Sequence, residues 1–205
     1  MSLAQDSGES DVDVEHGRNA TASLPDRRAE AAVADLLLAL GRDLGDPHLF
    51  ATPRRVVAAF REMLDREPLT MTTFPNEQGY DDLVLVREIP FTSLCAHHLL
   101  PFRGVAHVGY LPAERLLGLS KLARVVEHFA RDLQLQERLT MQIADYLATE
   151  LAPNGVGVVL EAEHLCMSTR GPRTPTARTR TARFTGALAD QGWERFGDVS
   201  LRHVE

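Results

Sequence analysis

Cysteine is scarce in this chain, with two residues among 205, and both lie in short apolar segments that also contain histidine. Two cysteines could form one disulfide. A reducing compartment and the neighbouring histidines instead favour thiolate side chains that bind a metal. The alternative without a functional role is that both cysteines are small buried hydrophobic residues and that the adjacent histidines are incidental.

Long hydrophobic runs and excess positive charge are also missing. No segment approaches the roughly 20 apolar residues of a membrane span, and the first residues lack the basic and apolar parts of a secretory signal. The formal net charge of −7 argues against general nucleic-acid binding, which normally needs a net basic face. We therefore expect a cytoplasmic protein that binds neither membrane nor nucleic acid, and whose anionic ligands need a local basic patch.

The composition that remains is that of an ordinary globular protein, with 44% hydrophobic and 25% charged residues. Residues 1–25 are rich in acidic and small polar residues and have little to bury, so we predict a disordered acidic tail. Residues 26–205 are predicted to form one domain.

Apolar periodicity divides this domain into helices and strands. Apolar residues at helical spacing predict N-terminal helices within 26–67 and two further helices that begin near residues 120 and 134. Runs rich in β-branched residues predict strands at 83–89 and 104–111, and a third at 156–166. We therefore expect a domain of helices and a sheet, with its core in residues 83–188.

Two stretches hold the residues best suited to bind a metal. Cys95 and His98 stand at i, i+3, so one turn can aim both side chains at one point, and thiolate and imidazole are ligands that Zn²⁺ prefers. Cys166 can supply a third ligand. A zinc ion with three protein ligands keeps its fourth position for water, as in catalytic sites, whereas structural sites have four protein ligands.

His164 is predicted to lie beside this metal. If 156–166 is a strand, His164 and Cys166 share parity and point to the same face. Because imidazole gives and takes protons near neutral pH, His164 is a candidate for proton transfer.

Several cations are candidates for binding an anion. Ser120 is expected to cap a helix whose first turns carry Lys121 and Arg124, and a helix start with two cations is suited to phosphate. Arg55 lies in the first turn of an earlier helix, where a cation opposes the helix dipole unless an anion is near. Arg170 belongs to a segment, 164–189, that contains five arginines and no acidic residue. For any one of these residues, a solvated surface position is the simpler reading.

Gln136 and Glu137 lie near the start of the last predicted helix. An amide beside a carboxylate can read the edge of a base, although most such pairs are polar surface.

Five sequence blocks, in this order, make the chain resemble the GTP cyclohydrolase I family: Cys-x-His-His-Leu-Leu-Pro-Phe, Gly-Leu-Ser-Lys-Leu-Ala-Arg, Leu-Gln-Glu-Arg-Leu-Thr, Glu-His-Leu-Cys-Met and Arg-Gly. The resemblance runs from about residue 25 to residue 188. It implies an α+β T-fold, in which two long helices back an antiparallel sheet and additional helices precede it. It also implies a toroidal homodecamer with active sites at subunit interfaces.

The resemblance also implies a role for each candidate. Zinc would be held by Cys95, His98 and Cys166; protons would be transferred by His164; and His97 would be a second active-site histidine of open role. The resemblance further implies substrate-binding residues that hold the triphosphate or read the guanine: Arg55, Ser120, Lys121, Arg124, Gln136, Glu137 and Arg170. In the implied reaction, water activated by Zn²⁺ attacks C8 of GTP, formate leaves, and the ribose rearranges to give 7,8-dihydroneopterin triphosphate. This reaction is the first step of tetrahydrofolate and pteridine biosynthesis.

The sequence departs from the family pattern at two places. Ala96 stands where the family usually has glutamate, which removes a carboxylate near the metal. The segment after Gly171, usually rich in Ser and Thr, carries Arg178, Arg180 and Arg183. These changes leave an alternative open: a non-catalytic or specialised T-fold paralogue that binds a purine or pterin, for example in a deazapurine pathway.

Overall fold

The computed structural model describes residues 23–197, and the chain divides into two compact units, residues 1–57 and 58–205. Most of the predicted acidic tail therefore lies outside the described residues. Each unit is described by itself. No helix among residues 23–197 is long and apolar enough to cross a membrane.

The first unit contains helix α1 (Leu24–Ala39) and the start of helix α2 (Thr52–Leu64), so the predicted N-terminal helices are present. Ser23 caps α1, and its hydroxyl accepts a hydrogen bond from the backbone N–H of Asp26 at 3.3 Å. None of the residues of α1 is buried. Within this unit, α1 therefore presents much of its apolar surface, including Leu36 and Leu38, to solvent.

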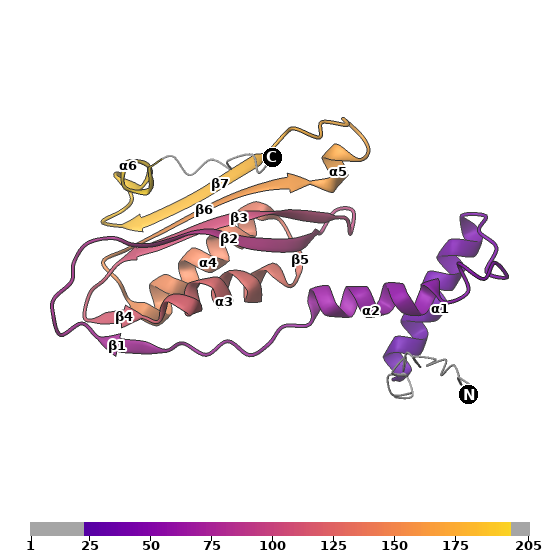
Figure 1. Ribbon diagram of the computed structural model, residues 1–205, viewed down its shortest axis with the longest axis horizontal. Coiled ribbons are helices and arrows are strands. Elements are labelled where there is room, and N and C mark those ends of the chain that lie inside the picture. The colour runs from indigo at the N-terminus through magenta and orange to yellow at the C-terminus, as the bar shows by residue number, and fades with distance from the viewer. Residues whose placement is uncertain (1–22, 198–205) are drawn as a thin grey trace, which may run out of the picture. The chain divides into compact units, whose positions relative to one another are not determined.

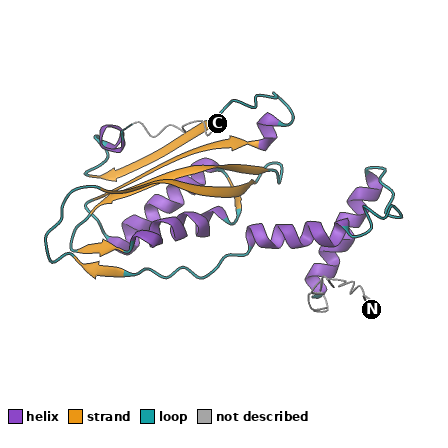
Figure 2. Cartoon of the chain, viewed as in Figure 1, coloured by secondary structure: helices purple, strands orange, loops and turns teal. Residues whose placement is uncertain are grey.

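The second unit is built on a five-stranded sheet with strand order β5-β2-β3-β6-β7 (Figures 1 and 2). Every neighbouring pair is antiparallel except β2 and β5. A separate two-stranded ribbon pairs β1 with β4. The strands are β1 (Thr73–Pro75), β2 (Val84–Cys95), β3 (Pro101–Leu111), β4 (Arg115–Leu117), β5 (Leu133–Gln134), β6 (Gly155–His164) and β7 (Thr179–Gly186).

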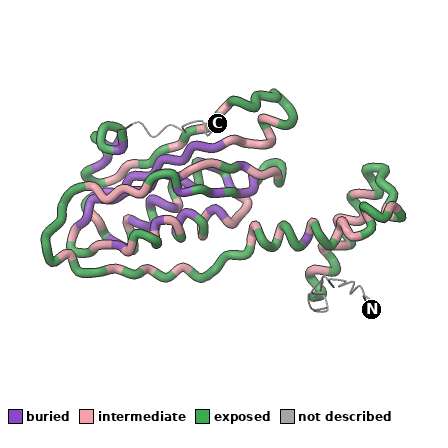
Figure 3. Tube along the Cα trace, in the orientation of Figure 1, coloured by how far each residue is buried: buried purple, intermediate pink, exposed green. Residues whose placement is uncertain are grey.

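Helices α3 (Leu119–Ala130) and α4 (Gln136–Leu151) cover one face of this sheet (Figure 1). The main core lies between the helices and the sheet, and the buried residues are concentrated on α3, α4, β3 and β6 (Figure 3). Fully burying one Val or Leu side chain stabilises the fold by about 1.5–3 kcal/mol relative to exposing it, so this layer fixes the helices on the sheet. Side chains with no exposed surface include Leu122, Val125, Val126, Leu139, Ile143 and Leu147.

Two short helices complete the unit. Helix α5 (Leu165–Ser168) directly follows β6, and helix α6 (Gly192–Phe196) contributes Phe196 to a smaller cluster with Leu111, Val159 and Leu188. The architecture confirms the predicted α+β class, with two helices backing an antiparallel sheet and additional N-terminal helices. One detail was wrong: the strand before Cys166 ends at His164, and Cys166 lies in α5.

Candidate metal centre and active site

A tight turn at the end of β2 brings the first two predicted ligands together. Cys95 is the last residue of β2, and its carbonyl accepts hydrogen bonds from the N–H of His98 at 3.3 Å and of Leu99 at 2.9 Å. Leu99 has a φ of 57°, which closes the turn in a left-handed conformation. The turn therefore brings Cys95 and His98 together, as their i, i+3 spacing predicted.

Cys166 reaches the same place from α5. The ligand atoms of Cys95, His98 and Cys166 all lie within 4.8 Å of one another. Register explains this meeting, because Leu94 pairs with Pro101 across β2 and β3, and Phe102 pairs with His164 across β3 and β6. The last residues of β2 and β6 therefore lie at the same end of the sheet.

The thiol of Cys166 suits a cation. Burial raises its pKa, and the neighbouring Cys95 raises it further, while the positive charge of Arg170 acts in the opposite direction. A metal ion between the two sulfurs would reverse this by favouring both thiolates. Two thiols and one imidazole are a donor set that fits Zn²⁺.

His97 lies close to this group but is not part of it. The Nδ1 atoms of His97 and His98 are each 3.9 Å from the sulfur of Cys95. The set of mutually close ligand atoms includes His98 and leaves out His97. His97 instead lines the adjoining pocket.

This pocket of about 310 Å³ opens beside the ligand group and gathers most of the candidates for chemistry. Two of the three predicted ligands line it, together with both predicted catalytic histidines and the two residues predicted to read a base. The lining residues are Cys95, His97, Gln134, Leu135, Gln136, Glu137, His164, Cys166, Met167 and Thr179.

His164 is fixed in this pocket by two contacts. Its ring stacks on Phe102, with centroids 4.6 Å apart and planes at 1°. Its Nε2 lies 2.8 Å from Oε1 of Gln136, so the imidazole donates and the amide oxygen accepts. Burial lowers the pKa of His164, and the charge of Glu137 partly opposes this. The parity argument therefore placed His164 correctly, although Cys166 is on a helix.

The Gln136 side chain is buried, with 2% exposure, and its amide nitrogen is surrounded by acceptors. Nε2 lies 3.2 Å from the Leu160 carbonyl, 2.9 Å from the Thr179 carbonyl and 3.1 Å from the hydroxyl of Thr181. Glu137, by contrast, is exposed at the pocket. The two residues that the sequence treated as a pair have different surroundings.

The cations on α3 lie away from this pocket. Lys121 and Arg124 occupy the first turns of α3, whereas the pocket residue Gln134 follows its last turn. A helix rises about 1.5 Å per residue, so Lys121 is about 14 Å along the axis from Ala130. Neither Lys121 nor Arg124 lines the pocket that contains His164.

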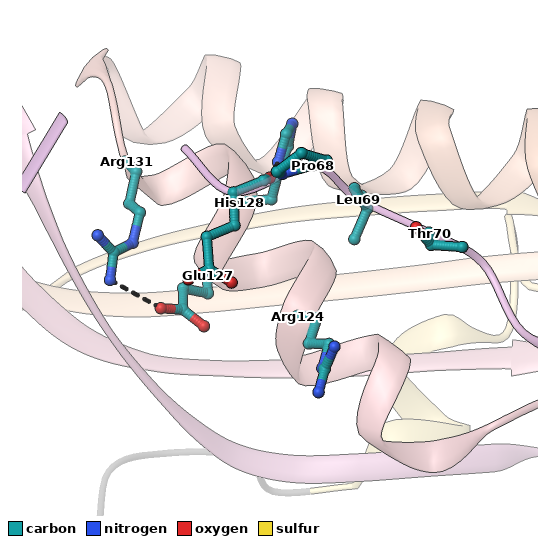
Figure 4. Close-up of a pocket in the computed structure, with 8 residues that line it drawn as sticks. Pro68, Leu69, Thr70, Arg124, Glu127, His128 and Arg131 are labelled. Atoms are coloured by element: carbon teal, nitrogen blue, oxygen red, sulfur yellow. Dashed lines mark hydrogen bonds and ion pairs between the residues drawn. The ribbon is translucent and has the colours of Figure 1, made fainter. Parts of the chain in front are cut away.

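Arg124 instead lines a separate hollow of about 200 Å³ between α3 and the extended segment 67–70 (Figure 4). The segment is held to α3 by Nδ1 of His128, which donates to the Glu67 carbonyl at 3.0 Å. Beside it, Arg131 pairs with Glu127 at 2.9 Å. Figure 4 shows Arg124 apart from this ion pair, with its guanidinium directed away from it.

The remaining predicted anion-binding residues are exposed. Helix α3 begins at Leu119 with Gly118 as its N-cap, so the expectation that Ser120 caps the helix was wrong; Ser120 lies in the first turn. Arg170 follows α5 and is exposed near Cys166. Arg55 is exposed on α2 in the first unit.

Part of the arginine-rich segment has a structural role. Arg180 donates through Nε and a terminal nitrogen to one carboxylate oxygen of Glu161, at 2.9 and 2.7 Å. Arg178 donates to the carbonyls of Pro175 and Ala177 in its own loop. These two arginines are therefore engaged within the chain.

Sequence reasoning missed the residues that support His164. Phe102 was visible as part of the motif after His98, but nothing in the sequence indicated that it would stack on His164. Thr140 and Thr181 carry no motif signal of their own; their hydroxyls meet at 2.7 Å only because α4 lies against β7.

Comparison with known proteins adds independent findings. Residues 29–197 match the protein family described as GTP cyclohydrolase I. The chain is 49% identical to GTP cyclohydrolase 1 of Streptomyces griseus over 179 residues, which covers 85% of this chain and 89% of the relative. It is 46% identical to GTP cyclohydrolase 1 of Corynebacterium glutamicum over 181 residues, with coverage of 86% and 92%. Among solved structures, an apo archaeosine synthase QueF-like protein aligns with a TM-score of 0.43 at 15% identity, covering 51% of this chain and 94% of that one.

Proposed function

The chain belongs to the GTP cyclohydrolase I family and is an enzyme of that type acting on GTP, and we propose that it converts GTP to 7,8-dihydroneopterin triphosphate and formate in the pocket beside Cys95, His98 and Cys166. The observation that carries this proposal is the meeting of a three-ligand group with an adjoining pocket that His164 lines. A zinc ion held by Cys95, His98 and Cys166 would have three protein ligands and would keep one coordination position for water.

We propose Zn²⁺ as the metal, because two thiols and an imidazole form the donor set and no carboxylate belongs to it. When bound, zinc supplies a Lewis acid that lowers the pKa of a coordinated water toward neutrality. The rigid turn at Cys95 and the short helix α5 would hold the ligands in place before the ion arrives. This pre-assembly supports a resident metal.

The proton transfers are assigned to His164. Its ring is fixed by Phe102, it lines the pocket, and it lies outside the ligand group. Burial favours the neutral imidazole, which can accept a proton from an attacking water and later give one to a leaving nitrogen. His97 lines the same pocket and is proposed as the second active-site histidine.

Guanine recognition is assigned first to Glu137, whose exposed carboxylate lies at the pocket and can accept from the N–H groups of a purine edge. Gln136 was predicted to share this role. Its amide is already engaged by protein groups, which leaves Glu137 as the group free to bind the base.

Triphosphate binding is assigned to Arg55, Ser120, Lys121, Arg124 and Arg170. Of these, Arg170 is close to Cys166, whereas Lys121 near the start of α3 and Arg124 in its middle do not line the pocket. Cations that cannot reach the pocket of their own chain could serve the pocket of another copy. This separation supports the homo-oligomer, a decamer by resemblance, with sites shared between subunits.

One observation favours the alternative of a non-catalytic or specialised paralogue. Ala96 lies between the ligand Cys95 and His97, at the position where a glutamate is usual in the family, and is exposed. The Arg180 departure carries less weight, because Arg180 pairs with Glu161. The cytoplasmic location and the place at the start of pteridine biosynthesis stay predictions.

Incubation of the purified protein with GTP and Zn²⁺ tests the proposal. We expect formate and, after oxidation, a fluorescent pterin in equal amounts, with neither product in the presence of a zinc chelator. Binding of GTP with zinc in place and no formate would support the paralogue instead.

A further inference from the structure

We propose that Gln136 is a positioning residue for His164, which it holds in the tautomer that carries a proton on Nε2 and a lone pair on Nδ1. This inference rests on the proposed role of His164 in proton transfer. It assigns Gln136 a function different from base recognition, and it makes Thr181 and Thr140 structural supports of the Gln136 amide.

The neighbours of the Gln136 side chain fix the orientation of its amide. Nε2 faces the carbonyls of Leu160 and Thr179, which can only accept hydrogen bonds. A flipped amide would put its oxygen against both carbonyls and its NH₂ group against His164. Because those buried acceptors demand donors, the oxygen must face the imidazole.

The hydroxyl hydrogen bonds of Thr140 and Thr181 have a defined direction. Thr140 donates its one hydroxyl proton to the backbone carbonyl of Gln136 at 2.8 Å. The contact of 2.7 Å between Thr140 and Thr181 must therefore use the proton of Thr181. The oxygen of Thr181 is then free to accept from Nε2 of Gln136 at 3.1 Å. These bonds form a closed, directed ring that fixes the amide from behind.

The orientation of the Gln136 amide determines the tautomer of His164. The amide oxygen of Gln136 can only accept, so Nε2 of His164 must carry the proton across the 2.8 Å contact. In the neutral ring, Nδ1 then holds the lone pair and is the nitrogen left to take a proton from water or substrate. Phe102, stacked at 4.6 Å, sets the plane of the ring, and Gln136 sets its rotation and tautomer.

Burial separates this role from base recognition. Gln136 is 2% exposed, and both protons of its amide are taken by the three acceptors around Nε2. No donor remains for a purine. A base read by this amide would have to break two buried hydrogen bonds, whereas Glu137 can bind one without any such loss.

Three variants test the proposal. Gln136→Met keeps the length of the side chain and removes its hydrogen bonds, so kcat for formate release should fall roughly 10–100-fold, as when a group that orients a functional histidine is lost, while KM for GTP stays within about 3-fold. Thr181→Val should lower kcat in the same direction but by less. Thr181→Ser keeps the hydroxyl and should retain the wild-type kcat.

A double-mutant cycle separates positioning from general damage. In a His164→Ser background, Gln136→Met should cost no further activity, because the residue it orients is gone. Zinc content and thermal midpoint are measured for every variant, and Thr181→Val replaces Gln136→Met in the cycle if the latter does not fold.

The outcomes distinguish this inference from the function it rests on. If His164→Ser keeps full formate release, the proposed role of His164 is wrong. If His164→Ser is impaired but Gln136→Met raises KM with kcat unchanged, Gln136 reads the base and does not position the histidine. Equal losses from Gln136→Met with and without His164 would also overturn the positioning role.

Discussion

The groups proposed for the chemistry and the groups proposed for the triphosphate are organised differently in this chain. Three metal-ligand atoms lie within 4.8 Å of one another beside a pocket that holds both candidate histidines. Within the second unit, the candidate phosphate-binding cations occupy separate places, with Lys121 and Arg124 on α3 and Arg170 after α5. Within residues 58–197, the chain therefore pre-assembles the ligand group but does not bring Lys121, Arg124 and Arg170 together.

Strand register explains the difference. The ligand turn, Phe102 and His164 are fixed by adjacent antiparallel strands, whose hydrogen bonds leave little freedom. The arginines Arg55, Arg124 and Arg170 are exposed and Lys121 is partly buried, so desolvation is small for most of these cations and like charges can stay apart in water. Bringing several cations together costs free energy unless an anion is bound, so a phosphate site completed by a second copy and by substrate is physically reasonable.

The largest effect should follow from breaking the ligand group. Cys95→Ala, His98→Ala and Cys166→Ala should each lose the single zinc per chain, and formate release should fall to background, because a three-ligand site cannot spare a ligand. Metal analysis of the purified variants by mass spectrometry checks this. Full zinc occupancy in any variant would remove that residue from the ligand set.

The next effect separates binding from reaction within the pocket. His164→Ser should leave zinc and GTP bound while formate release falls by about 10²–10⁴-fold, the usual contribution of a general acid–base group. Equilibrium binding of GTP and single-turnover formate release check the two parts. Loss of zinc together with activity would make His164 a fourth ligand and the metal structural.

Removing the cations should weaken substrate binding selectively. Lys121→Ala and Arg170→Ala should each raise KM for GTP by about 10-fold or more, because a charge-assisted hydrogen bond contributes roughly 1.5–3 kcal/mol. Binding of guanosine, which lacks phosphates, should hardly change. Arg61→Ala on α2, whose partner Asp65 lies on the surface, serves as the control. Equal losses for both ligands would move Lys121 and Arg170 out of the phosphate site.

The comparison predicts that the two regions can be supplied by different copies. Co-expressed Lys121→Ala and His164→Ser chains should assemble sites in which one copy contributes the pocket and another the intact α3. Random pairing at such an interface makes about one quarter of the sites complete. Activity above the sum of the separate variants checks this, and simple additivity would confine each site to one chain.

The smallest effect comes from a buried histidine outside both regions. His107 accepts from the N–H of Glu88 at 3.4 Å, and its Nε2 has no hydrogen-bond partner within residues 23–197. Burial lowers its pKa, helped by Arg87 and Arg180 and opposed by Glu88 and Glu161. The unfolded chain then binds more protons than the folded one as pH falls below about 6.5, so stability should decline there.

His107→Gln should reduce this decline without altering zinc content or KM, because His107 lies in the middle of β3, away from the strand end that carries Phe102, and is absent from the pocket lining. Chemical denaturation between pH 5 and 8 measures it. An unchanged pH dependence would assign acid sensitivity to other groups.

The sequence was sufficient for the features that depend on local spacing. The i, i+3 relation of Cys95 and His98 predicted their turn, and apolar periodicity predicted the four long helices and strands β2, β3 and β6, but not β7 or the short helices α5 and α6. Parity placed His164 beside the ligands. The predicted strand was too long at its end, because β6 ends at His164 and Cys166 lies in α5.

Features set by packing between distant elements could not be predicted. The stacking of Phe102 on His164 depends on the register of β3 and β6. The engagement of Gln136 depends on α4 lying against β6 and β7, which buries a residue that the sequence offered as a base-reading group or as polar surface. Ser120 lost its capping role because Gly118 took the N-cap position.

X-ray absorption at the zinc edge of the purified wild-type protein tests the central claim most directly. The account predicts two sulfur ligands at about 2.3 Å, one imidazole nitrogen at about 2.0–2.1 Å and one oxygen from water. The oxygen should disappear or shift when GTP is added to the His164→Ser variant. A shell of two sulfurs and two nitrogens with no oxygen would contradict the account, because the site would then be closed by four protein ligands.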